Sequence, residues 1–445
     1  MPKITHRKKR LSSFKLIVLG FAGVIVLGAL ILMLPFSSTA GVVTPFHEAL
    51  FTSTSAVCVT GLVVQDTGSY WSAFGQTVIL LLIQIGGLGV VTVAALFAML
   101  SGRKISLMQR STMQDAISAP KVGGIVRLTR FIVRGTFLIE LIGMIVMLPT
   151  FCGNYGFKGI WMAAFHSISA FCNAGFDILG TAENKYPSLT GYIGEPTINI
   201  AIMLLIIVGG IGFLTWDDIY TNKWHFKKYR MQSKVILVTT AILIIVPAVF
   251  FFFCDFTGLP LAERILASLF QSVTPRTAGF NTADLPAMTG SSKAIMTMLM
   301  LVGGSPGSTA GGMKTTTLAV LILSAFSVCR KKDDAEVCGR RIDGSAVKNA
   351  AAVAVMYFLL FFVGGIVIST AEGLPLSTCL YETASAVGTV GLTLGITPQL
   401  GVLSQLILIV LMYLGRVGGL TLIYAAVSNK NHSGAKLPLE KITVG

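Results

Sequence analysis

Ser55-Ala-Val-Cys-Val-Thr-Gly61 is the first of four related stretches in this chain. The others are Ser169-Ala-Phe-Cys-Asn-Ala-Gly175, Val273-Thr-Pro-Arg-Thr-Ala-Gly279 and Ser385-Ala-Val-Gly-Thr-Val-Gly391. Each copy ends in glycine, is followed by Leu or Phe, and lies between long apolar runs. Four such segments in one chain predict four quarters of a single pore.

The composition is that of a polytopic membrane protein. Of 445 residues, 53% are hydrophobic and 12% are charged, whereas a soluble domain is about 25% charged. The net charge of +15 comes from basic residues in short loops and not from one basic face, which argues against nucleic-acid binding. The seven cysteines are an odd number without a CxxC pair, so neither a zinc site nor a disulfide framework is expected.

The apolar runs divide the chain into four units of one pattern: a long run, a shorter segment ending in the glycine motif, and a second long run. A helix of about 14 residues covers ~20 Å, too short for the ~30 Å bilayer core, so each middle segment is expected to enter the membrane and turn back. The first long runs lie near 13–35, 128–150, 233–254 and 347–370, the middle segments near 45–58, 158–172, 260–274 and 375–387, and the second long runs near 73–100, 197–220, 290–325 and 401–427.

We therefore predict an all-α membrane protein with eight transmembrane helices, arranged as four helix–pore-loop–helix repeats around one pseudo-four-fold pore. The predicted parts are an N-terminal tail at 1–12, repeat one at 13–100, repeat two with its preceding loop at 101–220, repeat three at 221–325 with an intramembrane loop at 303–317, repeat four with its preceding loop at 326–427, and a C-terminal tail at 428–445.

The loops indicate the orientation. Lysine and arginine gather on the side that carries Lys3 to Arg10 and the connections near 103–130, 223–234 and 330–348. Because basic loops stay in the cytoplasm, both termini are expected there, with the chain in the plasma membrane. The same basic loops fit two interpretations, plain topology-setting charge and docking surfaces for a cytosolic partner.

The glycine motifs suit a cation filter. A dehydrated cation needs a ring of oxygens, which four symmetric backbone segments supply through their carbonyls. Pointing successive carbonyls inward needs alternating or positive φ, which glycine adopts without penalty. The candidate filter residues are Cys58, Val59, Thr60 and Gly61; Cys172, Asn173, Ala174 and Gly175; Arg276, Thr277, Ala278 and Gly279; and Gly388, Thr389, Val390 and Gly391.

With these motifs in place, the chain resembles the Trk/Ktr/HKT superfamily of potassium transporters, and most of all the Ktr-type membrane subunit, from about residue 13 onward. The resemblance implies K⁺ at the carbonyls of the four filters, a preference for potassium when all four glycines are present, and sodium conduction when serine replaces the first. It also implies a homodimer on a cytosolic nucleotide-binding ring (KtrA-like) that carries ATP or ADP. No cofactor is expected in this chain itself.

A glycine-rich stretch from 303 to 317 interrupts the second long run of repeat three. Glycine, proline and threonine make it a poor helix. Both a kinked helix and an irregular loop that obstructs the pore fit these residues, and the resemblance supports a gate loop. The candidate gate residues are Gly304, Ser305, Pro306, Gly307, Ser308, Gly311, Gly312, Lys314 and Arg416.

Two arginines stand out in apolar surroundings. Arg416 is interpreted as an electrostatic barrier below the filter, as an anchor for the gate loop, or as a helix-end arginine reaching the interface. The resemblance places it in the pore beneath the filter. Arg276 is expected to point behind the filter and to pair with Glu48, Glu263 or Glu382, because an unpaired buried charge is costly.

The predicted function is potassium uptake through the filter, gated by the loop and regulated by the partner, with ion gradients as the driving force. Sodium is either co-transported or a stimulator. The alternative is a sodium-coupled symporter with a midplane site, which should show inverted halves and matching broken helices. Four same-direction repeats and a single broken helix argue against it. His47 and His166 stand alone in the short segments, so no enzyme is expected.

Overall fold

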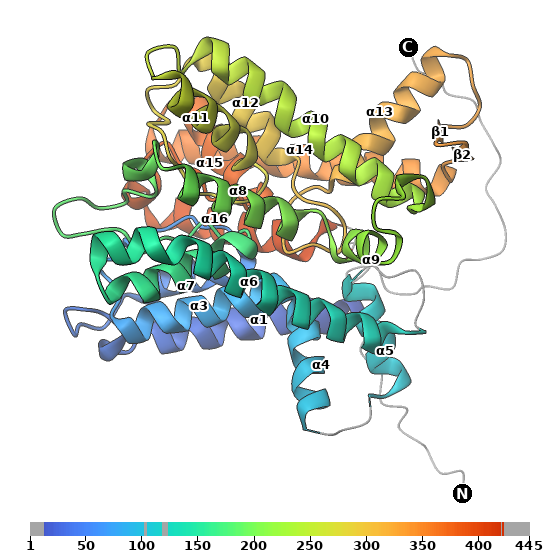
Figure 1. Cartoon of the computed structure of the whole chain (residues 1–445). Helices are drawn as coiled ribbons and strands as arrows, with labels where there is room; N and C mark the ends of the chain where they lie inside the picture. The colour runs from blue at the N-terminus through green and yellow to red at the C-terminus, as the bar shows by residue number, and fades with distance from the viewer. Residues whose placement is uncertain (1–12, 102–104, 118–122, 420, 422–445) are drawn as a thin grey trace, which may run out of the picture.

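The structure is a computed structural model that describes residues 13–101, 105–117, 123–419 and 421. The predicted tails at 1–12 and 428–445 lie outside these residues, as do many of the basic residues that suggested the orientation. Helices dominate the described residues (Figure 1). A two-stranded hairpin, β1 (Glu336–Val337) with β2 (Arg340–Arg341), lies between two of them.

The described residues fall into four similar helical units. In each unit a long first helix is followed by a short helix and then by a second run, which is divided into two helices in the first three units. The first helices are α1 (Ser13–Leu32), α6 (Ile125–Tyr155), α10 (Met231–Cys254) and α14 (Gly344–Glu372). The short helices are α2 (Phe46–Cys58), α7 (Lys158–Phe171), α11 (Leu261–Val273) and α15 (Leu376–Gly388). The second runs hold α3 (Ala73–Leu88) with α4 (Val90–Leu100), α8 (Pro196–Gly210) with α9 (Phe213–Asn222), α12 (Gly290–Leu301) with α13 (Thr315–Cys329), and α16 (Val402–Val417).

The four short helices confirm the sequence prediction to within one or two residues. Pro45, Pro260 and Pro375 each precede one of them. Proline fits the start of a helix because its missing N–H would have no helical partner there. The remaining helix, α5 (Leu107–Ile117), follows α4 and packs against α1 and α4.

By length and composition, four described helices can cross a membrane: α1, α6, α10 and α14. The number rises to six if each of the bent pairs α3–α4 and α8–α9 is one span. The helices α13 and α16 are apolar but shorter. These apolar helices are consistent with a multi-pass membrane protein. The predicted number of eight transmembrane helices stays a prediction.

The expectation of one broken helix is wrong. The chain bends by 95° between α3 and α4 and by 98° between α8 and α9. The bends fall at Gly89 and Gly212, with φ of 84° and 89°, and Gly418 ends α16 with φ of 86°. Each lies three residues after another glycine of the second run: Gly86, Gly209 or Gly415. A side chain is strained at such φ values, so glycine at these positions permits the bend.

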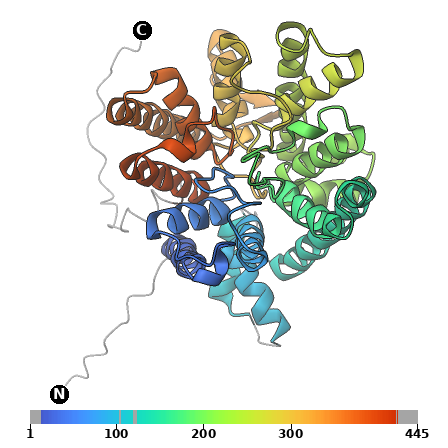
Figure 2. The same ribbon diagram turned by 90° about the vertical axis from the view of Figure 1, so that its left-hand side faces the viewer.

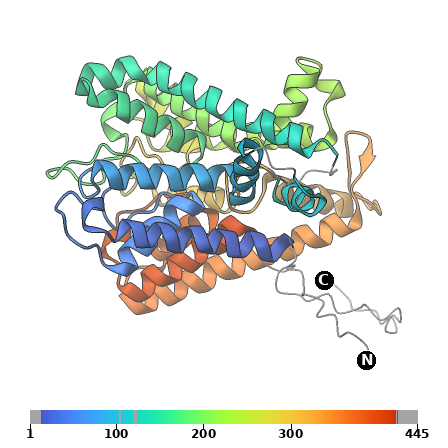
Figure 3. The ribbon, with the colours of Figure 1, turned by 90° about the horizontal axis from the view of Figure 1, so that it is seen from below.

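The four units close into a ring. Viewed down its axis, they follow one another in chain order around a centre of irregular backbone (Figure 2). The contacts are cyclic, because α3 packs on α7, α8 on α11, α12 on α15, and α16 on α2. The second run of each unit thus supports the short helix of the next. From the side, the long helices run roughly alongside one another, with α4 and α5 at one end (Figures 1 and 3).

Candidate ion pathway

The four glycines of the repeated motif meet at the centre of the ring. A β-carbon built on Gly61 would lie 2.4 Å from the carbonyl oxygen of Ala174, and one on Gly175 would lie 2.5 Å from that of Ala278. The same holds for Gly279 and Gly391, whose β-carbons would lie 2.3 Å from the oxygen of Val390 and 2.2 Å from that of Thr60. The glycine motif of each repeat is therefore in contact with the motif of the next repeat, and that of repeat four is in contact with that of repeat one.

The residue two places before each glycine has a left-handed backbone. These residues are Val59, Asn173, Thr277 and Thr389, with φ of 58°, 60°, 65° and 53°. Three of the four are β-branched, for which this conformation is unusual. Each glycine also has positive φ, between 67° and 96°. Strained backbone of about 1–3 kcal/mol per residue persists where the surroundings hold it, and it clusters at functional sites.

A hydroxyl at the end of each short helix holds the segment that follows. Ser55 and Ser385 accept hydrogen bonds from the N–H groups of Gly61 and Gly391 at 3.1 and 3.0 Å. Ser169 donates to the carbonyl of Phe176 at 2.7 Å.

Repeat three has Val273 where the other repeats have these serines. There the hydroxyl of Thr274 instead donates to the carbonyl of Phe280 at 2.5 Å. The hydroxyl that holds this segment thus stands one residue later in repeat three than in the other repeats.

Two cavities lie on opposite sides of the glycines. We call the first the outer cavity; its volume is about 230 Å³, and its lining includes the four glycines and the loops that follow them. Among the described residues that line it, Asp66 and Asp177 carry the charge. Burial, together with the nearby Asp66 carboxylate, raises the pKa of Asp177 to about 7. Negative charge at this mouth attracts cations.

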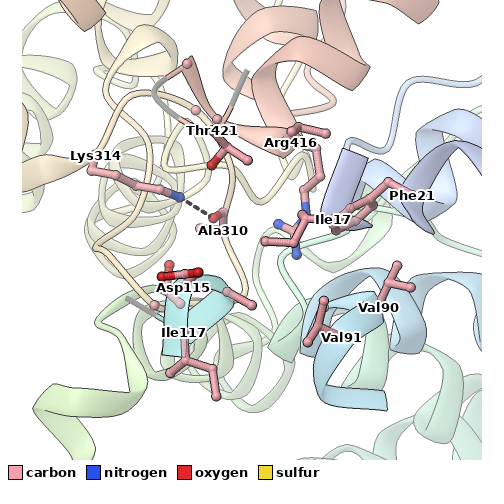
Figure 4. Close-up of a pocket in the computed structure, with 18 of the residues that line it drawn as sticks. Ile17, Phe21, Val90, Val91, Asp115, Ile117, Ala310, Lys314, Arg416 and Thr421 are labelled. Atoms are coloured by element: carbon pink, nitrogen blue, oxygen red, sulfur yellow. Dashed lines mark hydrogen bonds between the residues drawn. The ribbon is translucent and has the colours of Figure 1, made fainter. Parts of the chain in front are cut away.

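The inner cavity, of about 260 Å³, is lined by the stretch after α12, by Asp115 and Ile117 of α5, and by Arg416. Figure 4 shows these side chains facing a common space, with Lys314 and Arg416 from different elements. The stretch between α12 and α13 is not helical and closes on itself. Gly303 N–H donates to the Met313 carbonyl at 2.7 Å, and Thr315 N–H donates to that of Gly304 at 3.0 Å.

This loop, residues 302–314, lies between the glycine motif of repeat four and the end of α8 in repeat two. A β-carbon on Gly311 would lie 2.1 Å from the hydroxyl of Thr389, and one on Gly312 would lie 2.8 Å from the carbonyl oxygen of Gly388. On the other side, Ser305 N–H donates to the carbonyl of Gly210 at 2.9 Å. Of the two forms that the sequence allowed, the structure therefore has the irregular loop. The predicted residues Gly304, Ser305, Pro306, Gly307, Ser308, Gly311, Gly312 and Lys314 all lie in it.

Arg416 joins this loop to repeat one. Its guanidinium donates to the carbonyl of Thr309 and to those of Gly86, at 2.5 Å, and Gly87, at 3.4 Å. Lys314 folds back on its own loop, with its ammonium 2.8 Å from the carbonyl of Ala310. In the described part of the chain, no carboxylate pairs with either cation. Both side chains line the inner cavity.

The prediction that Arg276 forms an ion pair with a glutamate is wrong. Its side chain does point behind the glycines, where Nη1 lies 3.5 Å from the carbonyl of Thr240 on α10. No described carboxylate lies within 4.0 Å. Glu48 and Glu382 bind side chains of their own repeats, Gln65 and Thr397, and Glu263 is in the first turn of α11.

We expect Arg276→Met to raise the melting temperature of the purified protein by several degrees, because methionine removes a buried charge that lacks an anionic partner. Thermal unfolding in detergent measures this change. Arg264→Met is the matched control, because Arg264 donates two good hydrogen bonds to the Phe252 carbonyl and covers its ring. It should lower the melting temperature. A fall for Arg276→Met as large as the control's would mean that the charge is compensated.

A closed ring of four apolar units, with irregular backbone on its axis and a cavity on each side, defines a multi-pass membrane transport protein. A family model described as TrkH, cation transport protein, matches residues 21–433. The chain belongs to this family. The potassium/sodium uptake protein NtpJ of Enterococcus hirae is 39% identical over 98% of both chains.

The Ktr system potassium uptake protein B of Bacillus subtilis is 38% identical to this chain over 92% of each. The crystal structure of the potassium transporter TrkH from Vibrio parahaemolyticus shares the fold. Its TM-score is 0.74 at 19% identity, covering 96% of this chain and 87% of that one. The similar proteins are transporters, in keeping with the expectation that the chain is not an enzyme.

Proposed function

We propose that the chain takes up K⁺ across the cell membrane along the axis of the ring. The observation that carries this proposal is the closed contact of Gly61, Gly175, Gly279 and Gly391 with the carbonyls of the neighbouring repeats. Four strained segments of equal backbone form can offer oxygens to a dehydrated cation from four sides. Ion gradients supply the driving force, at about 2.3 kcal/mol per charge for 100 mV.

The loop at 302–314 acts as the gate in this proposal. It lies against the proposed filter segment of repeat four and is bonded through Thr309 to that of repeat two. Arg416 holds the loop against repeat one and places a positive charge on the cation path. Opening therefore requires the loop to leave these contacts, and the guanidinium to move with it or away from the axis.

A cytosolic nucleotide-binding ring of the KtrA type is the proposed regulator, and the chain is proposed to be a homodimer with both termini in the cytoplasm. Support comes from two similar proteins of Bacillus subtilis whose names place them in Ktr systems, potassium uptake proteins B and D. ATP and ADP would bind to that partner. The connections near 103–130, 223–234 and 330–348 are its candidate docking surfaces.

A sodium-coupled symporter remains the second candidate, because the bends at Gly89 and Gly212 occupy matching positions in two repeats. Broken helices in matching positions are typical of coupled transporters. The name of the Enterococcus hirae protein also includes sodium.

Uptake of K⁺ into proteoliposomes, with the membrane potential as the only driving force, tests the proposal. We expect uptake without Na⁺, accelerated when the cytosolic partner is added, and none in empty vesicles. Uptake that requires an inward Na⁺ gradient at every potential would favour the symporter. No K⁺ uptake with the partner and both ions present would contradict both candidates.

A further inference from the structure

Thr309 of the gate loop is bonded directly to the filter segment of repeat two. Its hydroxyl lies 2.9 Å from Oδ1 of Asn173 and 3.2 Å from the carbonyl of Phe171. Its N–H donates to the carbonyl of Gly209 at 3.3 Å. Thr309 and Asn173 are both fully buried. Any movement of the loop away from the filter must therefore break these bonds.

The other end of the Asn173 amide reaches the filter segment of repeat three. Nδ2 lies 3.4 Å from the carbonyl of Arg276 and 3.4 Å from that of Ile206 on α8. The amide therefore connects the gate loop on one side with two backbone segments on the other. Because Asn173 itself has φ of 60°, its side chain extends from a point where the filter backbone is already constrained.

The equivalent positions in the other repeats lack such a connection. Repeat one has Val59, which cannot form one, and the hydroxyls of Thr277 and Thr389 have no hydrogen-bond partner within the described residues. In repeat two, Thr215 lies six residues after Gly209, as Thr309 lies six residues after Gly303. The hydroxyl of Thr215 likewise has no partner within the described residues. Of the four equivalent positions, the one that contacts Thr309 of the gate loop is therefore the one that carries an amide, Asn173.

We propose that Asn173 and Thr309 couple the gate loop to the filter, so that release of the loop changes which cation the filter prefers. With the loop in place, Thr309 fixes the amide, and the amide fixes the spacing between the segments of repeats two and three. Once the loop leaves, Oδ1 loses the donor that holds the amide in this orientation. The amide then turns, and the carbonyl of Arg276 loses its donor. This inference rests on the proposed function.

The test compares Thr309→Val, which keeps the shape and removes the hydroxyl, with Thr309→Ser, which keeps the hydroxyl. The measurements are K⁺ and Na⁺ uptake by proteoliposomes and the K⁺ concentration that half-stabilises the purified protein against heat. We expect the valine variant to take up ions faster and to change its K⁺-to-Na⁺ ratio by about five- to tenfold, as for one lost buried hydrogen bond. The serine variant should retain the ratio of the unchanged protein.

A double-variant comparison separates coupling from simple loosening. Asn173→Gly removes the amide at a position where glycine tolerates the backbone. If the hydroxyl of Thr309 acts through the amide of Asn173, the double variant should have nearly the same K⁺-to-Na⁺ uptake ratio as Asn173→Gly alone. Faster uptake of Thr309→Val with an unchanged K⁺-to-Na⁺ ratio and unchanged half-stabilising K⁺ concentration would overturn the coupling.

These results also separate the coupling from the proposed function. If the unchanged protein takes up K⁺ selectively while Thr309→Val shows no change in ratio, the coupling alone fails. If the unchanged protein shows neither K⁺ uptake nor stabilisation by K⁺, the proposed function and the coupling fail together. If Thr309→Val does not transport, the K⁺ concentration that half-stabilises it against heat still tests the coupling. The coupling requires this concentration to differ from that of Thr309→Ser.

Discussion

Gly61→Ser is expected to reduce the preference for K⁺ over Na⁺ at least tenfold, which corresponds to a loss of ~1.4 kcal/mol of discrimination. The serine β-carbon would lie 2.4 Å from the carbonyl oxygen of Ala174, closer than real contacts allow, so the two segments must separate. The position also has φ of 91°, which disfavours an L side chain by ~1–2 kcal/mol. Uptake of both cations by proteoliposomes, measured side by side, gives the ratio.

Gly41→Ser is the matched control for this variant. Gly41 also has positive φ, 68°, but a β-carbon there would meet no atom within 4 Å. The control therefore carries a similar backbone strain without displacing a carbonyl of the ring. It should retain the K⁺-to-Na⁺ ratio. A ratio that stays unchanged in Gly61→Ser, while the protein folds and transports, would mean that the four glycines do not form the filter.

Arg416→Gln is expected to raise K⁺ uptake without the cytosolic partner at least tenfold. The substitution removes a positive charge from the inner cavity and the bonds that hold the Thr309 carbonyl against repeat one. In a medium of effective dielectric constant about 20, a unit charge ~8 Å from a permeating cation opposes it by ~2 kcal/mol. Initial rates of K⁺ uptake, with and without the partner, measure the effect.

Arg416→Lys distinguishes a barrier from an anchor. Lysine keeps the charge but lacks the planar fork that reaches two carbonyls at once. If K⁺ uptake by Arg416→Lys without the partner stays as low as in the unchanged protein, Arg416 acts as a barrier. If uptake rises as it does in Arg416→Gln, Arg416 acts as an anchor. Arg264→Gln is the control, since Arg264 also donates to a backbone carbonyl but lies at α11, outside the inner cavity. Unchanged uptake in Arg416→Gln would exclude both roles.

Local features of the chain were readable from the sequence. The four short helices, the break at 303–317 and the positive φ of Gly61 and its counterparts follow from the lengths of apolar runs and from where glycine, proline and threonine occur. Each depends on neighbours within a few residues. The same local signals mark residues 303–317 as a poor helix, whereas their interpretation as a gate was supported by the resemblance to the family.

The partners of buried polar groups depended on the tertiary structure. The sequence indicated that Arg276 needs compensation, but not that its side chain would face α10, away from every candidate carboxylate. It identified Asn173 through its backbone position, while the bond from its amide to Thr309 joins residues 136 positions apart. Sequence patterns over a few residues do not encode such contacts.

By itself, the sequence therefore determined that the chain is a helical membrane protein with four similar units, each marked by a short helix and a glycine. The tertiary structure decided that these units close into a ring in chain order, that two further helical runs bend at Gly89 and Gly212, and that the loop of repeat three lies against its neighbours. The physical reason is that helix formation and backbone strain are local, whereas closure and the pairing of buried groups depend on which surfaces pack together.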